Sequence, residues 1–116
     1  MAYFRGNPVA GIFGNETAGK VLLYVQNYGD GYARGIAQTF GLPHSVVQKQ
    51  LRRMESDGVL VSQLKGKTRV FTWNPRYALR TQLSTLLERA LLLIPAAERD
   101  RFLRERRRPR RTGKKL

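Results

Sequence analysis

The order of apolar and polar residues divides the chain into helical segments and one pair of short strands. Apolar residues that recur every three or four positions are typical of a helix with one buried face, and alternation is typical of a half-buried strand. The pattern predicts helices over residues 15–28, 32–40, 43–57 and 74–94, and strands over residues 59–64 and 68–73. Glycines follow the first three helices, and Gly66 separates the strands, which indicates helix ends and a hairpin turn.

The ends of these elements are marked by residues that satisfy or terminate a helix. Asn15 or Thr17 can cap the first helix, and Asn74 with Pro75 is expected to begin the fourth. A further stretch, residues 96–107, is expected to be helical at least in part. Residues 1–11 are rich in glycine and proline, so we expect an extended N-terminal arm there.

Two of the elements show clearly which face is buried. In the third helix, Val47, Leu51 and Met54 form one apolar stripe, and polar or charged residues occupy the other side. In the strands, apolar residues two positions apart share a face, which is typical of a hairpin with one face buried. These pairs are Val59 with Val61, and Phe71 with Trp73.

The long helix over residues 75–94 carries more leucine than so small a domain should need. Its apolar residues follow one another at alternating steps of four and three, which is the spacing of a coiled-coil seam. The stripe could simply cover the chain's own core. We favour a homodimer, because an exposed apolar remainder would otherwise be a liability. The expected dimerisation residues are Leu79, Leu83, Leu86, Leu87, Ala90, Leu93 and Ile94.

Composition excludes several classes of protein. The chain has 116 residues, no cysteine and one histidine, His44, so disulfide scaffolds, zinc fingers and thiol nucleophiles are excluded. We therefore expect no cofactor and no metal. No apolar stretch approaches the roughly 20 residues that cross a bilayer, and the N-terminus carries no signal-like segment. We expect a cytoplasmic, nucleoid-associated protein with no membrane partner.

The charge is concentrated at the C-terminal end. Residues 99–116 hold ten basic and two acidic residues, so they contribute +8 of the formal net charge of +14. Such a balance favours a polyanionic partner, and nucleic acid is the first candidate. The expected organisation is an N-terminal arm, a compact domain, a dimerisation helix and a basic tail, helical at first and then disordered. Their boundaries are residues 1–11, 12–74, 75–94 and 95–116.

The order helix, helix, tight turn, helix, hairpin resembles a winged helix-turn-helix. Residues 35–60 are similar without a gap to the helix-turn-helix of winged-helix repressors of the arsenic-repressor-like superfamily. Three shorter segments also resemble winged-helix domains associated with nucleotidyltransferases. They are Ile12-Phe13-Gly14, Tyr32-Ala33-Arg34 and Asn74-Pro75. The resemblance implies an α+β, mainly α fold with a long C-terminal helix and a basic tail.

The resemblance also implies which residues touch DNA. The third helix would enter the major groove, the hairpin would act as the wing, and the start of the second helix would contact phosphate. Gln48 suits adenine, whereas Lys49 and Arg52 suit guanine or phosphate. The expected DNA-binding residues are Tyr32, Arg34, His44, Ser45, Gln48, Lys49, Arg52, Arg53, Lys65, Lys67 and Arg69.

No constellation of residues points to catalysis, so we expect a protein that is not an enzyme. Members of the arsenic-type family that sense metals carry cysteine or histidine ligands, and this chain, with no cysteine and one histidine, departs from that pattern. The favoured function is sequence-specific binding of double-stranded DNA in transcription regulation, as a repressor or an activator, with the effector unknown. Two alternatives remain: an adaptor or antitoxin-like partner that binds a protein, and an RNA-binding protein. The tail offers few aromatic residues on which single-stranded bases could stack, which weighs against the last.

Overall fold

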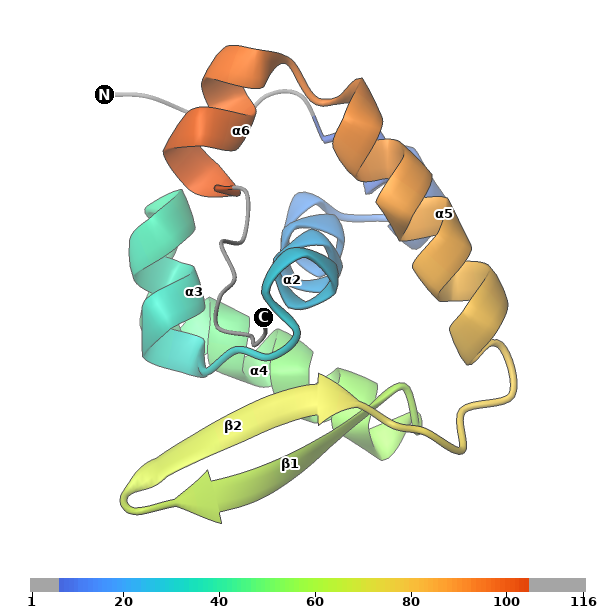
Figure 1. Cartoon of the computed structure of the whole chain (residues 1–116). Helices are drawn as coiled ribbons and strands as arrows, with labels where there is room; N and C mark the ends of the chain where they lie inside the picture. The colour runs from blue at the N-terminus through green and yellow to red at the C-terminus, as the bar shows by residue number, and fades with distance from the viewer. Residues whose placement is uncertain (1–6, 105–116) are drawn as a thin grey trace, which may run out of the picture.

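The computed structural model describes residues 7–104 and shows an α+β, mainly helical fold (Figure 1). This coarse class confirms the expectation from the sequence. The described elements follow one another as α1 (Ala10–Phe13), α2 (Glu16–Tyr28), α3 (Ala33–Phe40), α4 (His44–Ser56), β1 (Leu60–Lys65), β2 (Thr68–Trp73), α5 (Arg80–Leu93) and α6 (Ala96–Phe102). None of the described helices is long and apolar enough to cross a membrane.

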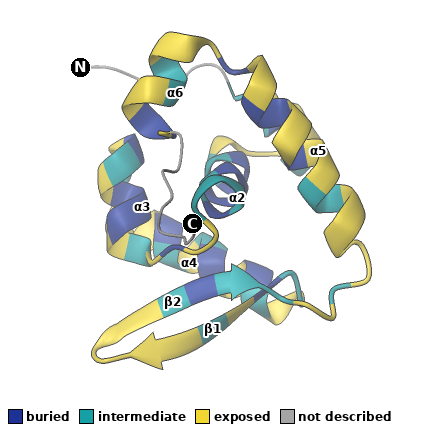
Figure 2. Ribbon diagram, in the orientation of Figure 1, coloured by how far each residue is buried: buried dark blue, intermediate teal, exposed yellow. Residues whose placement is uncertain are grey.

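Helix α2 lies at the centre of the fold, with the other helices around it and the hairpin below (Figure 1). Asn15 caps it, as expected, because its side-chain oxygen accepts a 2.7 Å hydrogen bond from the backbone N–H of Ala18. Gly29 ends the helix with a φ of 88°, in the left-handed region that glycine tolerates best. Figure 2 shows α2 as buried or half-buried over most of its length, and its buried residues include Val21, Leu23 and Val25.

Helices α3 and α4 are joined by a tight turn at Gly41, which has a φ of 67°. The predicted apolar stripe of α4 is confirmed, since Val47, Leu51 and Met54 are all buried. Because these residues pack inward, the opposite side of α4 is left facing solvent. That solvent-facing side carries several of the residues we expect to bind DNA.

Strands β1 and β2 form an antiparallel hairpin that pairs Leu60 with Trp73 and Ser62 with Phe71. The buried face is the one that carries Leu60 and Phe71, whereas Val61 lies on the other face and is exposed. Alternation along the strands is therefore as predicted, but the pair Val59 and Val61 does not mark the core face. The backbones of Gly31 and Phe71 also exchange hydrogen bonds of 3.0 and 2.8 Å, so the start of α3 is tied to β2.

The long helix begins later than the sequence indicated, because Asn74 shapes a turn instead of a helix start. Its side-chain amide donates a 2.9 Å hydrogen bond to the Gly58 carbonyl, and its side-chain oxygen accepts one of 3.0 Å from the Arg76 N–H. Helix α5 therefore starts at Arg80, and residues 74–79 lead from the hairpin to the far side of α2 (Figure 1).

The described part of the N-terminal arm is not extended. Residues 10–13 form α1, and Val9 is 1% exposed within the core. Asn7 holds this segment against the start of α2. Its side-chain amide donates a 3.2 Å hydrogen bond to the Glu16 carbonyl, and its side-chain oxygen accepts one from the Val9 N–H. The bond to Glu16 joins the arm to the first turn of α2, which the glycine and proline content of the arm did not reveal. Residues 1–6 lie outside the described part.

The first part of the expected tail belongs to the folded domain. Phe102 is buried at the end of α6, where its ring stacks on Phe40 at 5.9 Å between centroids. The hydroxyl oxygen of Tyr28 accepts a 2.9 Å hydrogen bond from the Arg104 N–H. Burial raises the pKa of nearby Tyr24 above its ordinary value, with a smaller contribution from Tyr28, whose ring lies 4.6 Å away between centroids. The remainder of the tail, residues 105–116, lies outside the described part.

Candidate nucleic-acid interface

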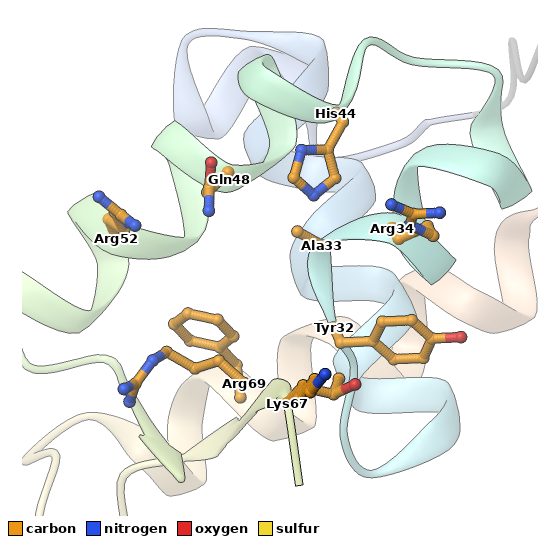
Figure 3. Close-up of a pocket in the computed structure, with 10 residues that line it drawn as sticks. Tyr32, Ala33, Arg34, His44, Gln48, Arg52, Lys67 and Arg69 are labelled. Carbon is orange, nitrogen blue, oxygen red and sulfur yellow. The ribbon is translucent and has the colours of Figure 1, made fainter. Parts of the chain in front are cut away.

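A groove of about 400 Å³ lies between the exposed side of α4, the start of α3 and the hairpin (Figure 3). Seven of the eleven residues predicted to bind DNA line this one groove. They are Tyr32, Arg34, His44, Gln48, Arg52, Lys67 and Arg69. Four of them are cations, and no carboxylate is among the described residues that line the groove. The groove is therefore a positively charged surface formed by three separate elements.

Helix α4 contributes one continuous row of side chains to the groove. His44, Gln48 and Arg52 are each four positions apart, so they lie one above another on the same side of the helix. At a rise of about 1.5 Å per residue, the row is about 12 Å long. Figure 3 shows the three side chains along α4, across an open space from the hairpin. Between them they carry an imidazole, an amide and a guanidinium, all of which can donate hydrogen bonds.

The hairpin contributes the opposite wall. Lys67 lies in its turn, and Arg69 lies on the same face of the hairpin as Phe71. The guanidinium of Arg69 donates a 3.0 Å hydrogen bond from Nη1 to Ser62 Oγ. Ser62 in turn donates a 2.6 Å hydrogen bond to Glu55 Oε2 on α4. Arg69 is therefore fixed relative to α4 by side chains as well as by the backbone.

The start of α3 closes the third side of the groove. The backbone pairing of Gly31 with Phe71 brings Tyr32 and Arg34 next to β2. Tyr32 is 42% exposed and Arg34 is also accessible to solvent, so both side chains can meet a partner. The ring of Tyr32 extends away from the centre of the groove, toward its edge (Figure 3).

The other four predicted residues are accessible but do not line the groove. Ser45 and Lys49 lie on a neighbouring row of α4. Lys65 lines a shallow depression on the outer face of the hairpin. Arg53 lines a different depression, on the far side of α4. The predicted set is thus divided into seven residues that lie on one surface and four that lie outside the groove.

Three lining residues were not predicted: Ala33, Thr68 and Phe71. Thr68 carries a hydroxyl that can donate or accept a hydrogen bond, and it directly follows Lys67 in the turn. Its position next to Lys67 could have identified Thr68 as a lining residue, since the hairpin was already expected to contact DNA. Phe71 gave no such signal, because it was assigned to the core, where most of its surface does lie.

The residues predicted for dimerisation divide into two groups on α5. Leu87, Ala90 and Ile94 are buried in the chain's own core, and Leu83 is partly buried against it. By contrast Leu79 is 56% exposed, Leu86 39% and Leu93 64%. These three follow one another at steps of seven residues, so they lie on one side of the helix. Leu92, which was not predicted, is also exposed.

Within residues 7–104, no group of three or more histidine, aspartate or glutamate side chains could hold a metal ion. Comparisons of the chain with models of known protein families, with curated proteins and with solved structures find no match. The argument for function therefore rests on the residues that line the groove and on their physical chemistry.

Proposed function

We propose that this chain is a winged helix-turn-helix protein that binds double-stranded DNA sequence-specifically and regulates transcription. One observation carries the proposal. The exposed side of α4, the hairpin turn and the start of α3 together form a cationic groove that contains seven of the residues expected at such an interface. The order of elements supports it, because in a winged helix-turn-helix the recognition helix comes directly before the hairpin that forms the wing, and α4 comes directly before β1 and β2.

Helix α4 has the shape and chemistry to read bases. The major groove of B-DNA is about 12 Å wide and admits a helix, and the apolar side of α4 is already occupied by the core. The row of His44, Gln48 and Arg52 would therefore meet the base edges. Gln48 can bond adenine with two hydrogen bonds, and Arg52 can bond guanine in the same way.

The remaining cations would bind phosphate. Arg34 at the start of α3 and Lys67 in the hairpin turn lie at the edges of the groove. Contacts to phosphate set the register of a protein on DNA and supply affinity without sequence preference. Arg69 is hydrogen-bonded to Ser62, and we expect it to contact the DNA phosphates beside the wing.

We propose further that the protein acts as a homodimer through α5. The exposed leucines Leu79, Leu86 and Leu93 form a stripe that the rest of the described chain leaves uncovered. In a two-fold symmetric dimer the same stripe would face itself, with Leu86 near the axis and Leu79 opposite Leu93 of the second copy. Two recognition helices would then reach half-sites about one helical turn apart.

Selection of bound fragments from random duplex DNA tests the proposal. We expect a consensus with two half-sites whose centres are about 10 base pairs apart, or a multiple of that spacing. A parallel selection with the variant Gln48→Ala and Arg52→Ala should lose preference at particular base pairs. Absence of any enriched sequence with the parent protein would overturn the proposal and favour a protein-binding adaptor.

A further inference from the structure

A second depression lies on the far side of α4 from the cationic groove. It has a volume of about 240 Å³ and is formed by α1, α2, α4 and the chain around the start of α5. Its walls are mostly apolar, with Phe13, Leu22, Met54 and Leu83 among them. Drug-sized ligand sites occupy roughly 300–1,000 Å³, so this cavity suits only a small molecule.

The rim of this cavity carries one cation and one anion. Arg53 and Asp57 both line it, at the C-terminal end of α4. Both residues are exposed, and neither side chain forms a hydrogen bond or an ion pair with another of residues 7–104. Arg53 lies in the last turn of α4 and Asp57 is its C-cap, so a cation and an anion border the same apolar pocket at one end of the helix.

We propose that this cavity binds a free α-amino acid with a large apolar side chain. Such a ligand carries a carboxylate and an ammonium group, and the rim of this one cavity offers a cation and an anion to meet them. The carboxylate would accept hydrogen bonds from the guanidinium of Arg53, in the bidentate geometry that this group favours. The ammonium group would donate to Asp57, and the side chain would fill the space between Phe13, Met54 and Leu83.

The location at the C-terminal end of α4 supports the place given to the ammonium group. The last carbonyls of α4 face the end of the helix at Asp57, and their partial negative charge favours a cation there. Gln50 also lines the cavity and offers an amide that can bond either charged group. A ligand with only an anionic group would leave Asp57 beside it as a repulsive charge. The cavity therefore selects a zwitterion over a simple carboxylic acid.

The inference does not rest on the proposed function, because it concerns a different side of α4. Binding of an amino acid can be measured on the protein alone, without DNA. If DNA binding fails while the amino acid binds, the proposed function falls and this inference stands. If DNA binds while the amino acid does not, this inference falls and the proposed function stands.

The test is a titration of isotope-labelled full-length protein with L-phenylalanine, followed by amide chemical shifts. We expect saturable shifts at residues around Phe13, Met54 and Leu83, with a dissociation constant in the millimolar range, as ordinary ligand efficiencies give for a dozen heavy atoms. Glycine lacks the apolar part, 3-phenylpropanoate lacks the ammonium group, and phenethylamine lacks the carboxylate. Each of these three should bind at least tenfold more weakly.

Matched variants complete the experiment. Arg53→Gln and Asp57→Asn should each weaken binding of phenylalanine about tenfold, since each removes a charged hydrogen-bond partner. Arg76→Gln removes an exposed charge that does not line the cavity, so it should leave the dissociation constant unchanged. The proposal is overturned if phenylalanine gives no saturable shifts, if shifts lie outside the cavity, or if 3-phenylpropanoate or phenethylamine binds as tightly as phenylalanine.

Discussion

Ser62 on β1 donates a 2.6 Å hydrogen bond to Glu55 on α4, and through it the hairpin is joined to the helix that forms the opposite wall of the cationic groove. Arg69 extends this connection, because its guanidinium donates to the same Ser62 hydroxyl oxygen. The carboxylate of Glu55 is thereby kept on the side of Ser62 that faces α4. The negative charge of Glu55, which would repel a polyanion, is thus bonded to Ser62 and does not line the groove.

Removal of the Ser62 hydroxyl should loosen the hairpin. For Ser62→Ala we expect a loss of about 1–2 kcal/mol in the free energy of unfolding, since a hydrogen bond to a charged partner is broken on each side. Urea denaturation followed by circular dichroism measures this loss. Gln63→Ala is the control, because Gln63 is exposed on the same strand and should change stability little. Equal midpoints for the two variants would show that the Ser62 bonds add no net stability.

The pairing of Gly31 with Phe71 leads to a second stability prediction. A Cβ atom at residue 31 would lie 2.9 Å from Ile36 Cδ1 and 3.1 Å from the ring of Tyr24. We therefore expect Gly31→Ala to cost about 1–3 kcal/mol by overpacking, and to disturb the approach of α3 to β2.

The control for this prediction is Gly11→Ala. Gly11 lies in α1, and an added Cβ would meet nothing within 4 Å. Alanine favours a helix over glycine, so this variant should be neutral or slightly stabilising. Thermal unfolding of both variants gives the comparison, and a Gly31→Ala protein as stable as the parent would contradict the close approach.

Much of the fold could be predicted from local signals in the sequence. The Asn15 cap, the glycines that end α2 and α3, and the apolar stripe of α4 each act within one turn or one helix. The predictions were wrong where contacts between residues distant in the sequence determine the structure. Asn74 bonds to Gly58 across the base of the hairpin, which delays the start of α5. Local propensity contains no information on such contacts.

The proposed base recognition by α4 leads to the prediction that tests the groove most directly. Gln48→Ala and Arg52→Ala should each weaken binding to the best duplex by roughly 1–3 kcal/mol and relax the choice at particular base pairs. Lys67→Ala should instead weaken all sequences alike, because we expect it to bind phosphate. Binding to a panel of duplexes with single-base changes measures both effects.

The control for the groove variants is Arg80→Ala. Arg80 is exposed at the start of α5 and does not line the groove, so this variant removes one charge at a distance. It should weaken binding far less than Arg52→Ala. If Gln48→Ala and Arg52→Ala change neither affinity nor preference, α4 is not the recognition helix.

The candidate site was predictable in part because a helical row is set by spacing alone. His44, Gln48 and Arg52 share a row whatever surrounds them. Arg53 is one position further on, and that single step carries it around α4 to the cavity on the far side. The sequence could not show this, because it does not reveal where the groove ends. Only the positions of the hairpin and of α5 define the two sides of α4.

Self-association through α5 should depend on its exposed leucines and not on its buried ones. We expect Leu86→Lys together with Leu93→Lys to give a folded monomer, because each fully buried leucine contributes on the order of 1.5–3 kcal/mol to an interface. Sedimentation at several concentrations measures the shift. Thr81→Lys with Glu88→Gln adds the same net charge at exposed positions of α5 and should leave the dimer intact. A parent protein that is monomeric at high concentration would refute the proposed dimer.

The final prediction concerns the basic segment that follows α6. Since Phe102 and Leu103 are buried, a truncation that tests the tail must begin after Arg104 and keep the domain whole. Residues 105–116 hold seven basic residues and one acidic residue. We expect them to bind phosphates without choosing sequence, so their removal should weaken binding to every duplex and preserve the ratio of specific to non-specific affinity.

The salt dependence of DNA binding distinguishes phosphate binding by residues 105–116 from binding of another partner by the same segment. Each phosphate that the protein no longer neutralises lowers the slope of log affinity against log salt by about 0.9, so a difference of about four phosphates per chain would be plain in one titration. A matched variant that keeps the full length and replaces the seven basic residues with glutamine distinguishes charge from chain length. Both altered proteins should show the same reduced slope. If both keep the slope of the parent on the same duplex, the segment does not bind DNA, and its charge serves an RNA or protein partner instead.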